Sequence, residues 1–300
     1  MTEIGNRKVQ TANCKSMRIG VTGARGFIGS HLVSALKKRG TVVTLLRQKG
    51  LPGKRELKQF ITGTDLFFHL GGVNRGTDEE ILNGNIIGTS RLLESILNNG
   101  KSSARLVFAS SAQVYPLVNC KTPIRETKKA NPDTVYGVSK QNAESLIRIS
   151  GIPFTVLRLS NVYGPGCRPN YNSVVATLCY RAVRGLPLVI NGDGRQGRDF
   201  VYIEDVVRAL GLAGFQSVAG SGKIFNVSSG KVVSVNQIVK QVCRLHKNTK
   251  VGFLTDKKNS DISYCCDSSR FSGKYSWPPR VSLSKGIEQT LSYYWGRKIT

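Results

Sequence analysis

The chain has 300 residues, 40% of them hydrophobic, and its 44 basic and 18 acidic side chains give a formal net charge of +26. This length suffices for one large domain or two closely associated ones. No segment approaches the roughly 20 uninterrupted apolar residues of a membrane span, so we expect a soluble protein without a membrane partner. The charge exceeds what a neutral metabolite requires and indicates an anionic ligand or partner.

A solvated basic surface is the alternative explanation of the charge. Nucleic acid is disfavoured as the partner because the sequence contains no basic binding module with interleaved aromatic residues. Residues 1–16 are polar and lack the apolar core of a secretion signal, so we interpret them as an N-terminal extension and expect a cytoplasmic location. The seven cysteines show no paired metal-ligand spacing. We therefore predict reduced thiols and no metal site.

The first predicted strand covers residues 17–21, and the glycine-rich stretch 22–29 (TGARGFIG) leads from it into an apolar pattern of helical spacing. Gly23 permits a tight turn, Gly26 lets backbone amides approach a diphosphate, and Gly29 lets the helix pack closely on the strand. The N-terminus of the helix then faces the anion. Because a glycine triplet alone also serves plain turns, its position between strand and helix carries the prediction of a dinucleotide-binding loop.

Residues 41–46 are β-branched and apolar and predict a second strand that ends at Arg47, followed by a short basic connection over residues 48–63. In a doubly wound fold the end of this strand meets the adenosine ribose, where an arginine can accept a 2′-phosphate. Arg47, together with Arg25 in the glycine turn, leaves the phosphorylated cofactor open. Arg47 may equally be explained as a solvent-facing side chain or one that stacks on adenine.

The rest of the first half alternates strands with helices, as βαβ units of a parallel sheet do. We predict strands over residues 66–70, 105–109 and 154–159, a helix over 79–97 and another within 130–150. Later elements are shorter, with helices near 173–184, 204–215, 234–246 and 284–295 and a strand at 188–190. We therefore predict an α/β protein with a Rossmann-type doubly wound parallel sheet and a smaller, interleaved C-terminal lobe.

The predicted domain boundaries follow from this pattern. Residues 17–165 form the dinucleotide-binding domain, to which the chain returns near 200–224, and residues 166–199 and 225–296 form the substrate-binding lobe. No linker separates the two, so we expect them to share a cleft.

Tyr136 and Lys140 lie one helical turn apart in the stretch YGVSK and therefore on one face of a helix. A tyrosine is a poor base at neutral pH until a neighbouring cation such as Lys140 stabilises its phenolate. Ser110 or Ser111, at the end of the preceding strand, can hydrogen-bond the same substrate hydroxyl. A Tyr and a Lys at this spacing are more often a surface pair, but their position downstream of a dinucleotide turn favours the catalytic interpretation.

At this point the chain resembles the extended short-chain dehydrogenase/reductases, and in particular the nucleotide-sugar epimerases and dehydratases. The resemblance runs from about residue 17 to residue 296. Its motifs are TGARGFIG at 22–29, HLGG at 69–72, NIIGT at 85–89, SSAQVY at 110–115, YGVSK at 136–140, LRLSNVYGP at 157–165 and NGDGRQGRDFVY at 191–202. Seven ordered matches leave little room for chance.

The resemblance implies a catalytic trio of Ser111, Tyr136 and Lys140 and a nicotinamide cofactor, NAD or NADP. The cofactor would contact Gly23, Arg25, Gly26, Phe27, Ile28, Gly29, Arg47, Leu70, Gly71, Tyr136 and Lys140. A nucleotide sugar, with a UDP-sugar as first expectation, would contact Asn161 and Arg198 through its diphosphate, because an arginine fork binds phosphate oxygens in pairs. Lys258 falls where relatives often place a second arginine.

The implied reaction begins when the Tyr136 phenolate takes the proton of a sugar hydroxyl while C4 passes a hydride to the nicotinamide. A UDP-sugar 4-epimerase returns the hydride to the other face of the 4-keto sugar. The alternative is a ketosugar reductase, because residues 69–75 and 167–173 are similar to reductases of capsule-sugar biosynthesis. A 4,6-dehydratase is disfavoured, since Ala112 and Gln113 replace the Asp-Glu pair of such relatives.

Three further expectations accompany this interpretation. A non-catalytic cofactor-sensing or RNA-associated protein is the third alternative, against which the retained tyrosine and lysine count. Relatives often dimerise through two helices, so we expect a homodimer, with the helices near 78–99 and 173–184 offering apolar faces. The segment between the second strand and Asp65 is short, as though one strand were missing, and Gly72, where relatives have alanine, should leave extra space near the nicotinamide.

Overall fold

Six parallel strands form the central sheet of the protein. The structure is a computed structural model that describes residues 17–39, 41–46, 53–116, 118–120, 122–171, 173–216, 222–247, 249–254 and 262–296. In sheet order the strands are β10 (Lys223–Val227), β5 (Phe154–Leu159), β4 (Arg105–Ser111), β3 (Leu66–His69), β1 (Arg18–Thr22) and β2 (Val42–Leu45). Every neighbouring pair is parallel. The predicted Rossmann-type α/β class is confirmed.

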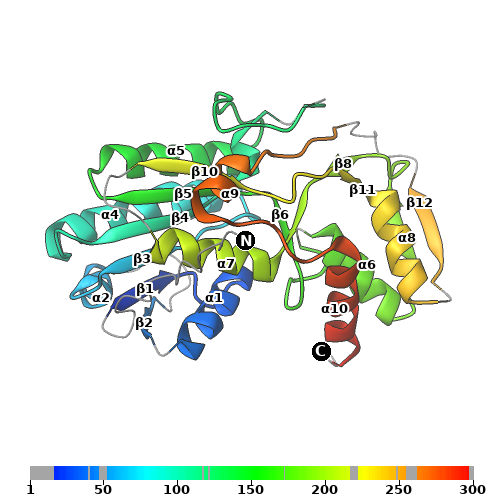
Figure 1. Ribbon diagram of the computed structural model, residues 1–300, viewed down its shortest axis with the longest axis horizontal. Helices are drawn as coiled ribbons and strands as arrows, with labels where there is room; N and C mark the ends of the chain where they lie inside the picture. Colours follow the sequence, from blue (N-terminus) through cyan, green and yellow to red (C-terminus); the bar gives the residue numbers. More distant parts are fainter. Residues whose placement is uncertain are drawn as a thin grey trace, which may run out of the picture.

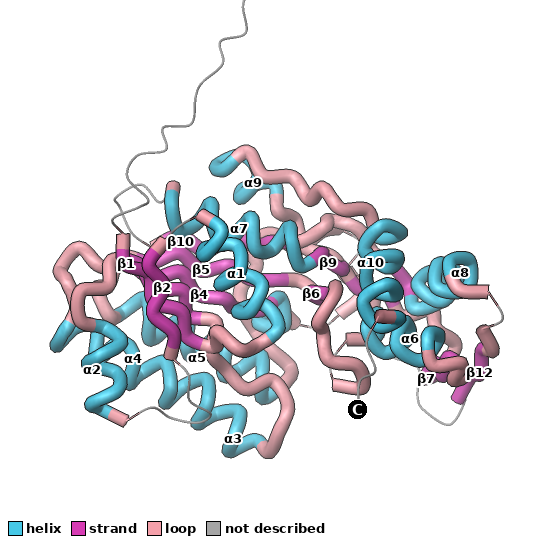
Figure 2. Tube along the Cα trace, turned by 90° about the horizontal axis from the view of Figure 1, so that it is seen from below, coloured by secondary structure: helices cyan, strands magenta, loops and turns pink. Residues whose placement is uncertain are grey.

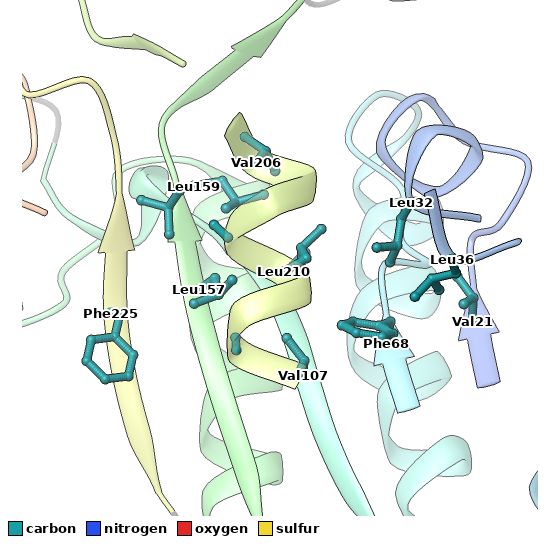
Figure 3. Close-up of a cluster of buried hydrophobic side chains, with 14 of the residues drawn as sticks. Val21, Leu32, Leu36, Phe68, Val107, Leu157, Leu159, Val206, Leu210 and Phe225 are labelled. Atoms are coloured by element: carbon teal, nitrogen blue, oxygen red, sulfur yellow. The ribbon is translucent and has the colours of Figure 1, made fainter. Parts of the chain in front are cut away.

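Helices cover both faces of this sheet (Figure 1). Helices α1 (Phe27–Lys38) and α7 (Ile203–Phe215) pack on one face, and α2 (Lys54–Ile61), α4 (Gly88–Asn99) and α5 (Val135–Ile149) pack on the other. Every residue of β3 and β5 is buried, as expected for parallel strands with helices on both sides. Figure 3 shows the first of these cores, in which Leu210 of α7 lies among apolar side chains of the sheet.

The connection between β2 and β3 differs from the prediction. We expected a basic loop over residues 48–63, but its second part forms α2, which begins at Lys54 and buries Leu57, Phe60 and Ile61. Three apolar side chains at helical spacing allow this short basic segment to pack on the sheet. In the described part of the chain β2 is the edge strand and α2 alone separates it from β3, in agreement with the expected loss of one strand.

The helix predicted over residues 79–97 contains an interruption. It begins as α3 (Asp78–Leu82), widens into a π-helical turn (Asn83–Ile87) and continues as α4. Thr77 caps its start through a capping box with Glu80. Single π turns often occur at functional sites, and this one contains the buried Asn85.

The second lobe is built on three helices with their own apolar core (Figure 2). These are α6 (Val174–Val183), α8 (Val235–Leu245) and α10 (Leu283–Trp295). Strand β7 (Leu188–Asn191) pairs in parallel with β12 (Val251–Leu254), which the sequence analysis did not predict, and β8 (Gly197–Arg198) pairs with β11 (Val233–Ser234). Helix α9 (Ser269–Tyr275) packs against the sheet near β10.

The two lobes are joined where β6 (Asn161–Tyr163) pairs with β9 (Phe200–Tyr202). From β9 the chain runs directly into α7 and so returns to the sheet. The ends of β4 and β5, the start of α5 and the β8–β9 segment therefore border one region. Among the described helices, none combines the length and the apolar character that crossing a bilayer requires.

Candidate active site

The glycine turn after β1 adopts the close geometry that the sequence predicted. Gly23 has a φ of +67°, and an added Cβ there would lie 2.6 Å from the backbone nitrogen of Gly71. Gly26 donates its backbone N–H to the Gly23 carbonyl at 2.9 Å. A Cβ on Gly29 would lie 2.1 Å from that same carbonyl oxygen. Glycine is therefore required at positions 23 and 29, because β1 and α1 approach each other at backbone contact distance.

The first turn of α1 provides donors for an anion. Gly26 is the N-cap of the helix and has no side chain with which to accept a hydrogen bond, and the first turn contains no acidic residue. The leading amides of a helix have no partner within the helix itself. Phe27 and Ile28 both line the cavity described below. The turn is thus suited to a diphosphate.

A buried histidine fixes the next loop against the glycine turn. The Thr89 hydroxyl donates to the Asn85 carbonyl at 2.6 Å, so it accepts from His69 Nε2 at 2.9 Å. His69 Nδ1 must then accept from the Thr22 hydroxyl at 2.7 Å, which in turn accepts the Gly71 N–H at 3.0 Å. Burial, together with the positive charge of Lys140, lowers the pKa of His69 to about 3. The ring is neutral, as this chain of hydrogen bonds requires.

The same loop is held from its other side by Asn85. Its side chain accepts the Val73 N–H and donates to the Val73 carbonyl, both at 2.8 Å, and also donates to Ser139 Oγ at 2.8 Å. A Cβ on Gly72 would lie 2.5 Å from Asn85 Oδ1. The expectation that Gly72 leaves extra space is therefore wrong, because the asparagine occupies that space.

The predicted catalytic trio meets where β4 ends and α5 begins. Ser111 is the last residue of β4, and the hydroxyl of Thr134 caps α5 by accepting the Gly137 N–H at 3.0 Å. This cap places Tyr136 in the first turn of the helix, where its hydroxyl hydrogen-bonds the Ser111 side chain. Lys140 follows one turn later and is buried, with its Nζ 6.0 Å from the centre of the Tyr136 ring.

The electrostatics of the trio differ from the simple expectation of a stabilised phenolate. Burial raises the pKa of Tyr136 to about 12, and the hydrogen bond from Ser111 opposes this only in part. Burial also lowers the pKa of Lys140 to about 8, against the raising effect of Glu144. The protein by itself therefore holds Tyr136 as a protonated phenol, and Lys140 titrates close to neutral pH.

A buried ion pair lies one turn below Lys140. Arg158 of β5 donates to both carboxylate oxygens of Glu144, at 3.0 and 2.7 Å, and to the Tyr115 hydroxyl at 2.9 Å. Ser110 also donates to Glu144, at 2.5 Å. Both charged side chains are buried. The pair joins α5 to two strands beneath the trio, and the sequence analysis did not identify it.

The substrate-side residues are held by the β8–β9 segment. Asn161 donates its side-chain amide to the Asp199 carbonyl at 2.9 Å, and its side chain also bonds that of Tyr264. Arg198 Nη1 donates to the carbonyls of Gly197, at 2.8 Å, and Ile262. The guanidinium carbon of Arg198 lies 5.5 Å from the centre of the Tyr264 ring. Arg198 and Asn161 are thus fixed at the junction of the lobes.

The carboxylate of Asp199 stabilises this junction. It accepts from the Ser229 N–H and hydroxyl at 2.8 Å, the Gly230 N–H at 3.1 Å and the Cys266 N–H at 3.3 Å. Burial raises its pKa to about 6 against the effect of these donors. Asp199 ties together segments that precede and follow Arg198 by tens of residues in the sequence.

A cavity of about 1030 Å³ connects these parts. The sequence-predicted residues that line it are Gly23, Arg25, Gly26, Phe27, Ile28, Gly29, Leu70, Ser111, Tyr136, Lys140, Asn161 and Arg198. Gly71 does not line it, because its N–H is turned to Thr22. Arg47 and Lys258 lie outside the described residues. The structure therefore brings both predicted sets of residues to one cavity.

Several lining residues were missed by the sequence analysis. Arg75 and Asp78 come from the loop after β3, Arg168 and Tyr171 from the loop before α6, and Tyr264 from the segment before α9. The guanidinium of Arg168 lies 5.2 Å from the centre of the Tyr171 ring. The resemblance of residues 167–173 to reductases was the one signal that could have identified two of them.

Comparisons with known proteins agree with this geometry. The chain is 34% identical over 259 residues to UDP-2-acetamido-2,6-beta-L-arabino-hexul-4-ose reductase of Pseudomonas aeruginosa, in a match that covers 82% of this chain and 62% of the reductase. The match thus spans less than two thirds of that relative. UDP-glucose 4-epimerase of Thermotoga maritima, solved with UDP-glucose, is similar with 29% identity and a TM-score of 0.84, over 93% of this chain and 98% of the epimerase.

A second solved structure, UDP-glucuronic acid 4-epimerase of Bacillus cereus in complex with UDP-glucuronic acid and NAD, is similar with 27% identity and a TM-score of 0.81. That match covers 93% of this chain and 99% of the epimerase. The sequence profile of the NAD dependent epimerase/dehydratase family matches residues 19–228. The resemblance first inferred from seven short motifs is confirmed, and the chain belongs to the NAD dependent epimerase/dehydratase family.

Proposed function

We propose that the protein is a nucleotide-sugar oxidoreductase that acts at C4 of the sugar, with a UDP-sugar 4-epimerase as the first candidate. One observation carries the proposal. Ser111, Tyr136 and Lys140 line the same cavity as the glycine turn at one end and Arg198 at the other. The two similar 4-epimerases, which match over nearly their whole length, support this assignment.

The residues fit a nicotinamide dinucleotide. The amides at the start of α1 would hold its diphosphate, and Lys140 would bond the nicotinamide ribose beside Tyr136. Arg25 lines the cavity and leaves NADP as well as NAD open. When bound, an oxidised nicotinamide supplies a hydride acceptor and a positive charge next to the tyrosine.

The nucleotide sugar would enter along a basic wall. Arg75, Arg168 and Arg198 line the cavity, whereas Asp78 is the one acidic side chain among its described lining residues. Nη1 of Arg198 is engaged by two carbonyls, which leaves Nε and Nη2 of the planar fork for phosphate oxygens. Asn161 would contact the same diphosphate. This asymmetry of charge favours a substrate with at least two negative charges.

The proton of the sugar hydroxyl would pass to Tyr136, and Ser111 would orient that hydroxyl. A phenol with a pKa of about 12 gives up its proton at neutral pH only when positive charge is close to it. The ammonium of Lys140, one turn away, provides part of this charge while it remains protonated. Activity in the oxidative direction should therefore depend on a protonated Lys140.

A 4-ketosugar reductase is the second candidate, favoured by two observations. The reductase of Pseudomonas aeruginosa is a relative with 34% identity. In addition, the raised pKa keeps on Tyr136 the proton that a ketone oxygen must receive during reduction. We do not propose a 4,6-dehydratase, because Ala112 is apolar and Gln113, which lines the cavity, is an amide whose Oε1 accepts from Thr134 at 3.4 Å.

The purified protein distinguishes the candidates. An epimerase should retain nicotinamide through purification and interconvert UDP-glucose and UDP-galactose without added cofactor. A reductase should instead consume added NADH or NADPH in proportion to a UDP-4-ketosugar. Tyr136→Phe is the control for both assays. Absence of both activities across neutral and N-acetylated UDP-sugars, with cofactor shown to bind, would contradict the proposal.

We further propose that the protein works as a homodimer in the cytoplasm. The apolar face of α6 is buried in the second lobe and is unavailable for such a contact. Helices α4 and α5 pack together and expose Leu97 and Ile149, which supports a contact through these two helices. Light scattering should give twice the monomer mass, and Leu97→Glu should reduce it to the monomer mass.

A further inference from the structure

The end of the second lobe that lies away from the sheet combines exposed apolar and basic side chains. Trp295 is 70% exposed, Leu186 43%, Val251 42% and Leu245 38%. Isolated apolar side chains at a surface are ordinary. These four, however, belong to elements that gather at one end of the molecule, namely α10, the turn before β7, β12 and α8 (Figures 1 and 2).

Printed contacts connect these elements into one surface. The ring of His246 lies 5.6 Å from that of Trp295, and His246 accepts a bond from Thr249 through its carbonyl at 2.7 Å. The Lys250 carbonyl accepts the Leu188 N–H at 2.7 Å, and Val251 is the register partner of Leu188. We define the end patch as Leu186, Leu245, Lys247, Lys250, Val251 and Trp295.

The end patch and its surroundings carry positive charge alone. Segments 181–189, 244–254 and 291–296 contain five lysines and arginines and neither aspartate nor glutamate. The nearest acid along α10 is Glu288, which is paired with Lys285 at 2.9 Å. None of the six end-patch residues lines the catalytic cavity. A diphosphate substrate therefore does not account for the basic charge collected here.

We propose that the end patch docks the protein on an anionic lipid surface. Tryptophan favours the boundary between hydrocarbon and water, where Leu186 and Val251 would be buried in the same layer. Lys247 and Lys250 would lie at the level of the lipid phosphates. The earlier expectation of no membrane partner rested on the absence of a spanning segment, and peripheral docking requires no such segment.

The composition of the end patch favours lipid over two other partners. Leucine and valine side chains offer no aromatic plane on which bases could stack, so nucleic acid would leave most of the apolar surface unused. A second copy of this chain would bring two basic surfaces together, and like charges disfavour that contact. Docking at this site would also use part of the net charge of +26, which the proposed enzymatic function leaves unexplained.

Intrinsic fluorescence tests the proposal directly. The chain has two tryptophans, of which Trp277 is fully buried and Trp295 exposed. Adding phosphatidylcholine vesicles that contain phosphatidylglycerol should shift the emission to shorter wavelength, and brominated lipid should quench it. Pure phosphatidylcholine vesicles should have little effect, and added salt should weaken the response. Sedimentation with the same vesicles measures the bound fraction.

Two double variants remove the two parts of the end patch. Lys247→Glu with Lys250→Glu reverses charge, and Leu186→Ser with Trp295→Ser removes apolar surface; each should lower the vesicle partition coefficient by about tenfold or more. Matched controls are Lys128→Glu with Lys129→Glu, an equal charge change at exposed positions elsewhere, and Ile149→Ser, which replaces an apolar side chain that is 76% exposed. Both controls should bind as the parent does, and nucleotide-sugar turnover in solution should be unchanged in all four.

The proposal is overturned if the parent chain does not bind the anionic vesicles, or if the end-patch variants and the controls lose binding equally. It is also overturned if the end-patch variants change the oligomeric mass or abolish binding to single-stranded RNA while vesicle binding persists. The first of these would assign the surface to a second copy, the second to nucleic acid. Because turnover is measured on the same preparations, failure of docking and failure of the proposed enzymatic function remain distinguishable.

Discussion

Replacing Glu144 with glutamine should destabilise the fold and change the pH dependence of turnover. In the parent, the carboxylate accepts two hydrogen bonds from Arg158 and one from Ser110, and both charged side chains are buried. Glutamine keeps the size of the side chain but removes its charge, which leaves the Arg158 guanidinium buried without an anion. Breaking a buried pair from one side typically costs about 3–5 kcal/mol of unfolding free energy.

Urea unfolding measures this cost. The double variant Glu144→Gln with Arg158→Met removes both charges and should recover most of the lost stability, because a neutral replacement leaves no unpaired charge. Glu94→Gln on the exposed side of α4 is the matched control and should unfold as the parent does. If Glu144→Gln loses less than about 1 kcal/mol, the assignment of a stabilising buried pair is refuted.

The catalytic effect has a definite sign. The pKa of Lys140, which burial lowers to about 8, is raised by the negative charge of Glu144. Without that charge Lys140 loses its proton at lower pH, so the basic limb of the kcat profile should move toward lower pH. A purely structural role would reduce kcat by a similar factor at every pH. An unshifted basic limb in a folded Glu144→Gln protein would therefore contradict the electrostatic coupling.

Three further substitutions test the site. Tyr136→Phe should lower kcat by about 100-fold or more while the cofactor stays bound, because it removes the proton acceptor and little volume. Arg198→Ala should raise KM by about tenfold or more with kcat nearly unchanged, since diphosphate contacts are equal in the ground and transition states. Gly29→Ala should lower the free energy of unfolding by about 1–3 kcal/mol and release the cofactor, because its Cβ would meet the Gly23 carbonyl at 2.1 Å. Steady-state kinetics, cofactor fluorescence and urea unfolding measure these effects.

Each of these substitutions has a control and a contradicting result. Full activity of Tyr136→Phe would overturn the assignment of the proton acceptor. For Arg198→Ala the control is Arg195→Ala, which lies nearby and has a largely exposed side chain, and a lowered kcat with unchanged KM would contradict diphosphate binding. For Gly29→Ala the control is Gly273→Ala in α9, where an added Cβ meets no atom within 4 Å. Equal stability of both glycine variants would contradict the close approach of α1 to β1.

Short-range patterns in the sequence were sufficient to predict the sheet and the catalytic trio. Strand β5 was predicted at its observed bounds because every one of its residues is buried. Tyr136 and Lys140 could be paired without a structure, because four residues bring two side chains to one face of any helix. The role of Gly23 followed in the same way from the turn between β1 and α1.

The structure was needed wherever residues distant in sequence meet. Glu144, Arg158 and Tyr115 form their network through packing of α5 on the sheet, and no spacing in the sequence predicts it. The pKa of Tyr136 likewise depends on burial by surrounding elements, which reversed the direction expected from Lys140 alone. The end patch is a similar case, because Leu186 and Trp295 are separated by more than a hundred residues.

The division between the two has a physical basis. Backbone geometry and apolar periodicity are set by neighbouring residues, so the sequence by itself determined the glycine turn, the parallel sheet and the Tyr136–Lys140 pair. Desolvation and hydrogen-bond partners depend on which elements pack together, so only the tertiary structure decided that His69 is neutral, that Asn85 fills the space beside Gly72, and that Tyr264 borders the substrate cavity.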